Sequence, residues 1–189
     1  MRICPMGTGS SFPAAYRPQS DMLFLLTTTM NRIVEVRSQD AIIILESGIL
    51  TSELNKCLEG SPWTLPQAFI QYPGTMGGAL LSSDPNGARH LEFKRRLLGV
   101  EMIDPRGRLL KFGSGTMKNV AGYDFWTFLV GTRGRFGILT KIALNLENLP
   151  LLVPLPPMDA EQRNPEEDTI RWIYANLEKK LDPDGIFTR

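Results

Sequence analysis

The sequence contains very little cysteine and histidine. Among its 189 residues there are two cysteines, Cys4 and Cys57, and one histidine, His90. The cysteines are far apart and show no C-x-x-C spacing, which argues against a zinc or thiol-redox site and favours buried or free thiols in a reducing cytosol. A single histidine excludes any site that needs two. We interpret His90, which follows Arg89, as a solvated loop residue.

An excess of charge of one sign and a long hydrophobic run are also missing. Lysine and arginine number 21 and aspartate and glutamate 20, a net charge of +1, so nothing predicts a nucleic-acid partner. No window approaches the ~20 apolar residues of a membrane span, and residues 1–20 lack the basic start and apolar core of a signal peptide. We expect a cytoplasmic protein whose only membrane association is peripheral, through partner subunits.

The composition that remains is that of a globular α+β protein. An apolar fraction of 42% is ordinary, and the length suits one domain or two small lobes that share a core. Apolar and β-branched runs predict a mixed sheet of about eight short strands. The clearest strands are expected at 22–26, 33–36, 41–45, 97–103, 108–112 and 138–144, with 97–112 as a hairpin.

Capping residues and prolines predict where helices and loops lie. We expect a helix capped by Thr51 or Ser52 and ending at Gly60, and a short helix over 125–130. Residues 61–73 contain three prolines and are predicted to be an extended loop. Further along, 149–157 is rich in proline and is interpreted as a linker, and 168–181 has the apolar stripe of an amphipathic helix.

Three glycine-rich turns stand out, at 7–11, 74–78 and 131–137. Glycine lets backbone N–H groups approach a ligand that side chains would otherwise block. One such turn is weak evidence, but three turns at the ends of strands or helices suggest an extended ligand that contains a pyrophosphate. None is a G-x-G-x-x-G that opens a helix after a first strand, and the first lacks the lysine of a P-loop, so a Rossmann domain or a nucleotide triphosphatase is a poor match.

These turns, together with one further motif, resemble a known family. Residues 118–124 are Lys-Asn-Val-Ala-Gly-Tyr-Asp, and 130–140 contain a G-x-x-G-x-x-G-I pattern. With Gly74 to Ala79, they resemble the PCMH-type flavin-binding domain of the FAD-linked, vanillyl-alcohol-oxidase-like oxidases. Within that family, the FAD-binding E subunit of bacterial glycolate oxidase is the most similar. The resemblance covers roughly 2–147 and returns at 181–187.

The resemblance implies an architecture and a set of cofactor contacts. FAD would lie between two α/β subdomains, about 1–72 and 73–148, followed by a Pro-rich linker at 149–165 and a C-terminal helix and tail, 166–189, that pack back on the domain. The implied contacts around the pyrophosphate are Pro5, Met6, Gly7, Thr8, Gly9, Ser10 and Ser11. The loop that passes the pyrophosphate and the isoalloxazine is implied at Gly74, Thr75, Met76, Gly77 and Gly78, followed by a stretch of small residues with Ser82, Ser83 and Gly87. Asn119, Gly122 and Tyr123 would form a flavin-proximal turn, and Gly131, Gly134, Gly137 and Ile138 would lie near the adenosine. It implies no metal ligand, and no catalytic residue can be assigned.

The implied function is that of an FAD-dependent oxidoreductase that transfers hydride from a small 2-hydroxy acid to non-covalent FAD. Compared with the family, the sequence begins at the first glycine loop, without the preceding strand–helix–strand unit, and only the Pro-rich segment stands where the substrate cap is expected. We therefore expect flavin and iron–sulfur partner subunits to complete the site. Two alternatives stay open. One is a structural or assembly subunit that has lost flavin, and the other is a flavoprotein related to the cell-wall precursor reductases.

Overall fold

The computed structural model describes residues 2–12, 20–113, 125–148, 182 and 184–186. The predicted flavin-proximal turn with Asn119, Gly122 and Tyr123 lies outside these residues. So do the Pro-rich linker and the amphipathic helix over 168–181. No helix among the described residues is both long and apolar enough to cross a membrane.

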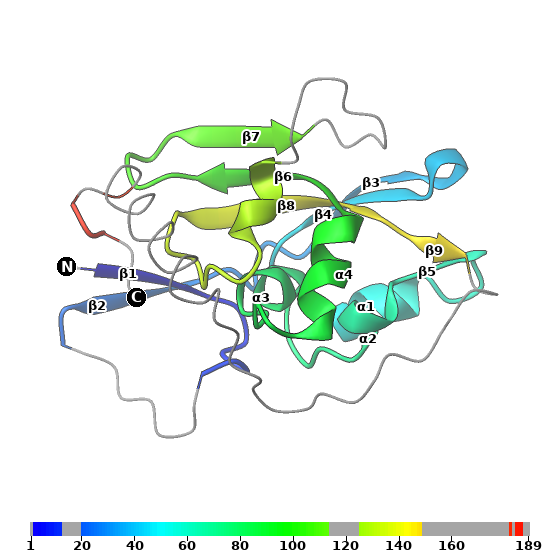
Figure 1. Ribbon diagram of the computed structural model, residues 1–189, viewed down its shortest axis with the longest axis horizontal. Coiled ribbons are helices and arrows are strands. Elements are labelled where there is room, and N and C mark those ends of the chain that lie inside the picture. The colour runs from blue at the N-terminus through cyan, green and yellow to red at the C-terminus, as the bar shows by residue number, and fades with distance from the viewer. Residues whose placement is uncertain (1, 13–19, 114–124, 149–181, 183, 187–189) are drawn as a thin grey trace.

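The centre of the fold is a five-stranded sheet with the strand order β3-β4-β8-β6-β7, and every neighbouring pair is antiparallel (Figure 1). The strands are β3 (Ile33–Arg37), β4 (Ile42–Glu46), β6 (Leu97–Ile103), β7 (Leu109–Gly113) and β8 (Ile138–Asn145). Each coincides with a predicted strand to within a few residues, and β6 and β7 form the predicted hairpin. β4, which is nearly all apolar, pairs with β8 in the interior of the sheet, and most residues of both strands are buried.

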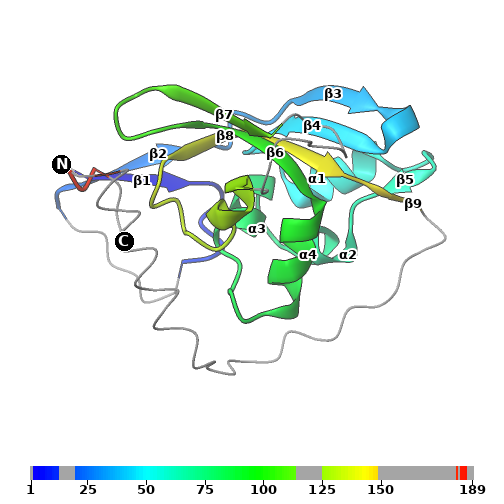
Figure 2. The same ribbon diagram turned by 45° about the horizontal axis from the view of Figure 1, so that its top comes forward.

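The helices gather on one face of this sheet (Figures 1 and 2). They are α1 (Thr51–Cys57), α2 (Gln67–Ile70), α3 (Met76–Leu81), α4 (Ala88–Arg96) and the 3₁₀ helix η2 (Phe125–Leu129). A further 3₁₀ helix, η1 (Ser38–Asp40), connects β3 to β4. Helices segregated to one face of an antiparallel sheet define an α+β fold, as predicted. The helix expected over 125–130 is η2.

Three local predictions were wrong. Residues 61–73 are not one extended loop, because they contain β5 (Trp63–Thr64), which pairs with β9 (Glu147–Asn148), and α2. Neither Thr51 nor Ser52 caps α1, whose N-cap is Leu50 and makes no side-chain cap bond. The Thr51 hydroxyl instead donates to the carbonyl of Tyr72 at 2.5 Å. Both cysteines are free, as expected, with Cys4 buried and Cys57 exposed.

The third error concerns His90, which is not a solvated loop residue. It lies on α4 and is only 4% exposed. The sequence offers no apolar stripe long enough to predict α4, and a short helix in a protein draws its stability mainly from tertiary packing.

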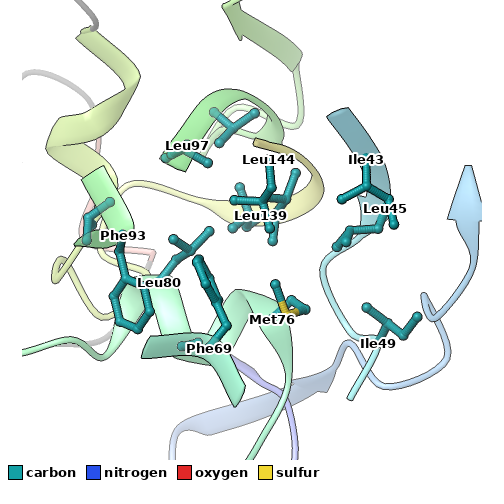
Figure 3. Close-up of a cluster of buried hydrophobic side chains, with 14 of the residues drawn as sticks. Ile43, Leu45, Ile49, Phe69, Met76, Leu80, Phe93, Leu97, Leu139 and Leu144 are labelled. Atoms are coloured by element: carbon teal, nitrogen blue, oxygen red, sulfur yellow. The ribbon is translucent and has the colours of Figure 1, made fainter. Parts of the chain in front are cut away.

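The hydrophobic core lies between the sheet and its helices (Figure 3). Phe69 of α2 and Phe93 of α4 meet with ring centroids 4.5 Å apart, and Met76 and Leu80 of α3 point into the same cluster (Figure 3). Burying each such side chain contributes about 1.5–3 kcal/mol. The core therefore fixes α3 beneath β4 and β8.

A second, smaller sheet carries the first glycine loop. β1 (Arg2–Met6) pairs in parallel with β2 (Met22–Leu26). The N–H of Ile3 donates to the carbonyl of Ile186 at 2.7 Å, so Ile186, near the other end of the chain, lies beside β1. β1 leads directly into residues 7–12, which face α3 of the larger body.

Candidate functional site

A cavity of about 410 Å³ lies where the loop after β1 meets α3. This volume falls within the roughly 300–1,000 Å³ of small-molecule and cofactor sites. The lining residues are Cys4, Pro5, Met6, Gly7, Thr8, Gly9, Ser10, Ser11, Phe12, Thr27, Ser47, Tyr72, Thr75, Gly77, Gly78, Leu81, Ser82, Arg133, Gly134 and Leu139.

The cavity brings together parts of all three predicted glycine turns. The first turn contributes every predicted residue from Pro5 to Ser11, the second contributes Thr75, Gly77, Gly78 and Ser82, and the third contributes Gly134. The remaining predicted residues that the structure describes, Gly74, Met76, Ser83, Gly87, Gly131, Gly137 and Ile138, are not among the lining residues. Met76 is fully buried in the core, and Ile138 opens β8.

The first loop offers unpaired backbone donors. Within the described chain, the N–H groups of Gly7 to Ser11 have no hydrogen-bond partner, whereas the N–H of Phe12 donates to the carbonyl of Gly9 at 3.0 Å. Gly9 has φ +76°, a left-handed conformation that glycine adopts readily. Successive N–H groups in such a turn form a concave surface that suits an anion.

The start of α3, in contrast, has its donors already engaged. The N–H of Met76 donates to Ile49 at 2.9 Å and that of Gly77 to Ser47 at 2.7 Å. Thr75, the N-cap, accepts from the N–H of Gly78 at 3.1 Å. Any anion in the cavity would therefore meet its free N–H groups on the loop 7–11 rather than on α3.

The glycines serve close contacts between parts of the protein. A Cβ atom on Gly7 would lie 2.3 Å from Oγ1 of Thr75, and one on Gly77 would lie 3.0 Å from Cβ of Ser47. A Cβ atom on Gly74 would lie 2.6 Å from Oγ of Ser10. The sequence pattern suggested that glycines make room for a ligand, but these three make room for neighbouring side chains. Two of the contacts, Gly7 with Thr75 and Gly74 with Ser10, lie between the loop 7–12 and the start of α3.

Eight of the lining residues were not predicted: Cys4, Phe12, Thr27, Ser47, Tyr72, Leu81, Arg133 and Leu139. Among these, Tyr72 supplies a phenolic hydroxyl and Arg133 a positive charge. Tyr72 belongs to the segment interpreted as a proline loop, yet its hydroxyl bonds both Ser11 and Ser82, the latter at 2.9 Å. Arg133 lies between two predicted glycines, and its position inside the G-x-x-G pattern was the available signal. It has φ +57°, which a non-glycine residue rarely adopts and which tends to occur at functional sites.

The electrostatics of the lining favour an anion. Among the residues that the structure describes, Arg133 is the only charged residue of the lining, and neither aspartate nor glutamate contributes to it. Arg133 forms no ion pair with any described residue. A lone cation and unpaired N–H groups suit a phosphorylated ligand, and the apolar side chains of Leu81 and Leu139 suit a flat ring.

Outside the cavity lining, His90 and Ser83 form a polar pair. Nδ1 of His90 is 2.7 Å from Oγ of Ser83. Burial, reinforced by the positive charge of Lys94 and opposed by Asp84, lowers the pKa of His90 to about 4. A Cβ atom on Gly131 would lie 3.2 Å from Cε1 of this imidazole. His90 thus joins α4 to the turns at 83 and 131 in its neutral form, without lining the cavity.

Fold and cavity together define a domain for a nucleotide-like cofactor, and sequence comparison identifies the class. The FAD binding domain family matches residues 1–113, more than half of the chain, so the chain belongs to this family. FAD is its cofactor, and the free N–H groups of 7–11, Arg133 and the absence of carboxylates among the described lining residues fit the two negative charges of the FAD pyrophosphate. The resemblance drawn from the sequence motifs is confirmed.

Several curated proteins are similar to the chain in sequence. The chain is 25% identical over 179 residues to the glycolate oxidase subunit GlcD of Bacillus subtilis, covering 93% of this chain and 35% of that protein. It is 26% identical over 151 residues to a mitochondrial D-lactate dehydrogenase (cytochrome) of Arabidopsis thaliana, covering 78% of this chain and 26% of the other. It is 21% identical over 183 residues to D-2-hydroxyglutarate dehydrogenase of Stutzerimonas stutzeri, covering 95% and 39%. The chain thus spans only about a quarter to two fifths of the length of these relatives.

Among solved structures, alkyldihydroxyacetonephosphate synthase shares the fold. Its TM-score is 0.60 at 23% identity, over 80% of this chain and 28% of the synthase. This likeness concerns the fold alone and agrees with the PCMH-type FAD-binding architecture predicted from the sequence.

Proposed function

We propose that the chain is the FAD-binding part of an enzyme that oxidises a 2-hydroxy acid, and that it holds FAD non-covalently in the cavity between the loop 7–12 and α3. The observation that carries the proposal is the set of unpaired N–H groups of Gly7 to Ser11, on a cavity whose only charged lining residue among those described is Arg133. Glycolate, lactate and 2-hydroxyglutarate, which the names of the relatives contain, are all 2-hydroxy acids.

The lining of the cavity supplies both polar and apolar groups. We assign the pyrophosphate to the N–H groups of 7–11 and to Arg133, since both favour negative charge. We assign the flavin side to the wall that includes Leu81 and Leu139. Bound FAD would supply the two-electron redox chemistry, while the chain binds and orients it.

Substrate contacts and acid–base chemistry would come from other residues of the complete enzyme. The described lining residues include no histidine, lysine, aspartate or glutamate that could take the proton of a substrate hydroxyl. The Bacillus subtilis relative is named as a subunit. Partner subunits of the flavin and iron–sulfur type, in a cytoplasmic assembly that touches the membrane only through its partners, would supply the missing groups.

An absorption spectrum of the purified chain tests the proposal directly. The protein is incubated with FAD, freed of excess cofactor by gel filtration and scanned for the flavin bands. We expect bound flavin, and we expect acid precipitation to release all of it into the supernatant, because no covalent link is proposed. A chain that stays colourless after incubation would refute the proposal and favour the alternative of a structural subunit without flavin. Flavin that stays in the acid pellet would refute the non-covalent assignment.

A further inference from the structure

Three hydroxyl groups meet on the wall of the cavity. Oγ of Ser11, Oη of Tyr72 and Oγ of Ser82 each lie within hydrogen-bond distance of the other two, with Ser11 and Ser82 2.8 Å apart and Tyr72 and Ser82 2.9 Å apart. All three residues line the cavity. They come from the loop after β1, the segment before α3 and the end of α3, so the cluster joins the small sheet to the larger body.

Tyr72 is held in place by two glycines. A Cβ atom on Gly74 would lie 2.7 Å from Cε1 of Tyr72, and one on Gly78 would lie 3.1 Å from its Oη. The ring thus occupies space that these glycines leave open. Its hydroxyl is therefore presented to the cavity at a defined place.

The protons of the cluster can be counted. The Ser82 hydroxyl donates to the carbonyl of Gly78 at 2.5 Å, and a carbonyl oxygen can only accept, so the single proton of Ser82 is committed. Two protons remain, on Ser11 and Tyr72, for the three contacts among the hydroxyls. One of the three oxygen–oxygen contacts therefore has no proton between its atoms. The cluster has more acceptor lone pairs than protons to fill them.

This surplus determines what kind of ligand group the cluster suits. A phosphate oxygen only accepts, so binding it would take a proton away from an internal hydrogen bond. A sugar hydroxyl brings its own proton and can donate to the surplus lone pairs while it accepts in turn. FAD carries such hydroxyls in two places, on the ribityl chain beside the flavin ring and on the ribose of the adenosine.

We infer that Ser11, Tyr72 and Ser82 form a subsite for a sugar hydroxyl of FAD, distinct from the phosphate-facing N–H groups of the loop 7–11. This inference rests on the proposed binding of FAD in the cavity. It gives Tyr72 a role as a positioning residue that sets where the cofactor lies along the cavity.

The test measures the affinities of the Tyr72→Phe variant, which keeps the ring over Gly74 and removes only Oη. Dissociation constants are compared with those of the wild-type chain for four probes: FAD, riboflavin, ADP and inorganic pyrophosphate. Ser82→Ala is a second variant, and Ser52→Ala, on the exposed surface of α1, is its matched control. One lost hydrogen bond predicts an affinity for FAD that is about three- to tenfold weaker in both cluster variants, with the control unchanged.

The probes separate the possible sources and the possible failures. If the cluster variants bind riboflavin more weakly by the same factor and bind ADP normally, the subsite belongs to the ribityl chain. If they bind ADP more weakly and riboflavin normally, it belongs to the ribose. In both cases the affinity for pyrophosphate stays unchanged. A Tyr72→Phe variant that binds FAD normally would overturn the inference. So would one that loses pyrophosphate by the same factor, because the cluster would then bind phosphate or merely hold the loop in place. A wild-type chain that binds no FAD would instead overturn the proposed function, and the inference with it.

Discussion

Gly7 lies so close to Thr75 that a Cβ atom on residue 7 would be 2.3 Å from the Oγ1 atom of the threonine. Thr75 is 2% exposed and caps α3 through the N–H of Gly78, so its side chain has little freedom to move away. This contact joins the loop after β1 to α3 at the edge of the cavity. The position of the unpaired N–H groups of 7–11 therefore depends on the absence of a side chain at residue 7.

The Gly7–Thr75 contact predicts a non-additive pair of substitutions. Gly7→Ala should destabilise the chain by about 1–3 kcal/mol through overpacking, and Thr75→Ala by ~1 kcal/mol through loss of the cap. In the double variant the alanine at 75 leaves room for the alanine at 7, so the combined loss should be smaller than the sum. Urea denaturation of the four proteins measures this coupling. Strict additivity would mean that the two residues do not touch.

Arg133 should contribute charge rather than shape to cofactor binding. We expect Arg133→Gln to weaken FAD binding about tenfold or more, because a charge-assisted hydrogen bond contributes about 1.5–3 kcal/mol. Arg106→Gln is the control, since it removes the same charge from the exposed turn between β6 and β7. Titrations at low and high salt complete the measurement, because the difference between wild type and Arg133→Gln should shrink as salt rises. Equal losses in the two variants would point to net charge alone.

His90 predicts a stability loss on mild acidification. Its pKa is about 4 in the folded chain against an ordinary value of 6.5, so between these values the unfolded chain binds the extra proton. Stability from the neutral imidazole is complete above pH 6.5 and declines as the pH falls toward about 4. The denaturation midpoint should fall over this interval, and in His90→Gln it should change less.

The carboxyl group of Glu46 affects stability in a lower pH range than His90 does. Arg32 bonds hold the pKa of Glu46 below its usual 4.5, although burial opposes them. Stability from Glu46 is therefore lost only as the pH falls below that value. A wild-type midpoint that stays constant from neutral pH down to about pH 5 would show that His90 is not the buried neutral imidazole described above.

The strands were predictable from the sequence, and the short helices were not. β4 is a run of isoleucine and leucine that ends in Glu46, and β8 is an apolar run interrupted by Thr140 and Lys141; both lie between turns, a pattern that suffices to predict a buried strand. Four-residue α2 and six-residue α3 have too few positions for a helical period to be visible. Phe69 and Met76 are fully buried, so these helices are stabilised by packing against residues that are distant in the sequence.

The candidate site was predictable in outline only. Parts of the three predicted glycine turns meet at the cavity, because glycines mark places where backbones approach closely. The pattern alone could not show what approaches: at Gly7 it is Thr75, and at Gly74 it is Ser10 and Tyr72. Tyr72 could not be predicted from the sequence, because its hydroxyl bonds Ser11 and Ser82, which lie 61 and 10 residues away along the chain.

The separation of β1 and β2 from the five-stranded sheet has a mechanical consequence. One wall of the cavity belongs to the small sheet and its loop, and the other to the larger body, so a ligand that contacts both walls stabilises their association. By mass action, its binding free energy would add to the work required to detach the small sheet from the large one. Amide hydrogen exchange in β1 should therefore slow when FAD is added, while exchange in the centre of β8, already enclosed by the core, should change little.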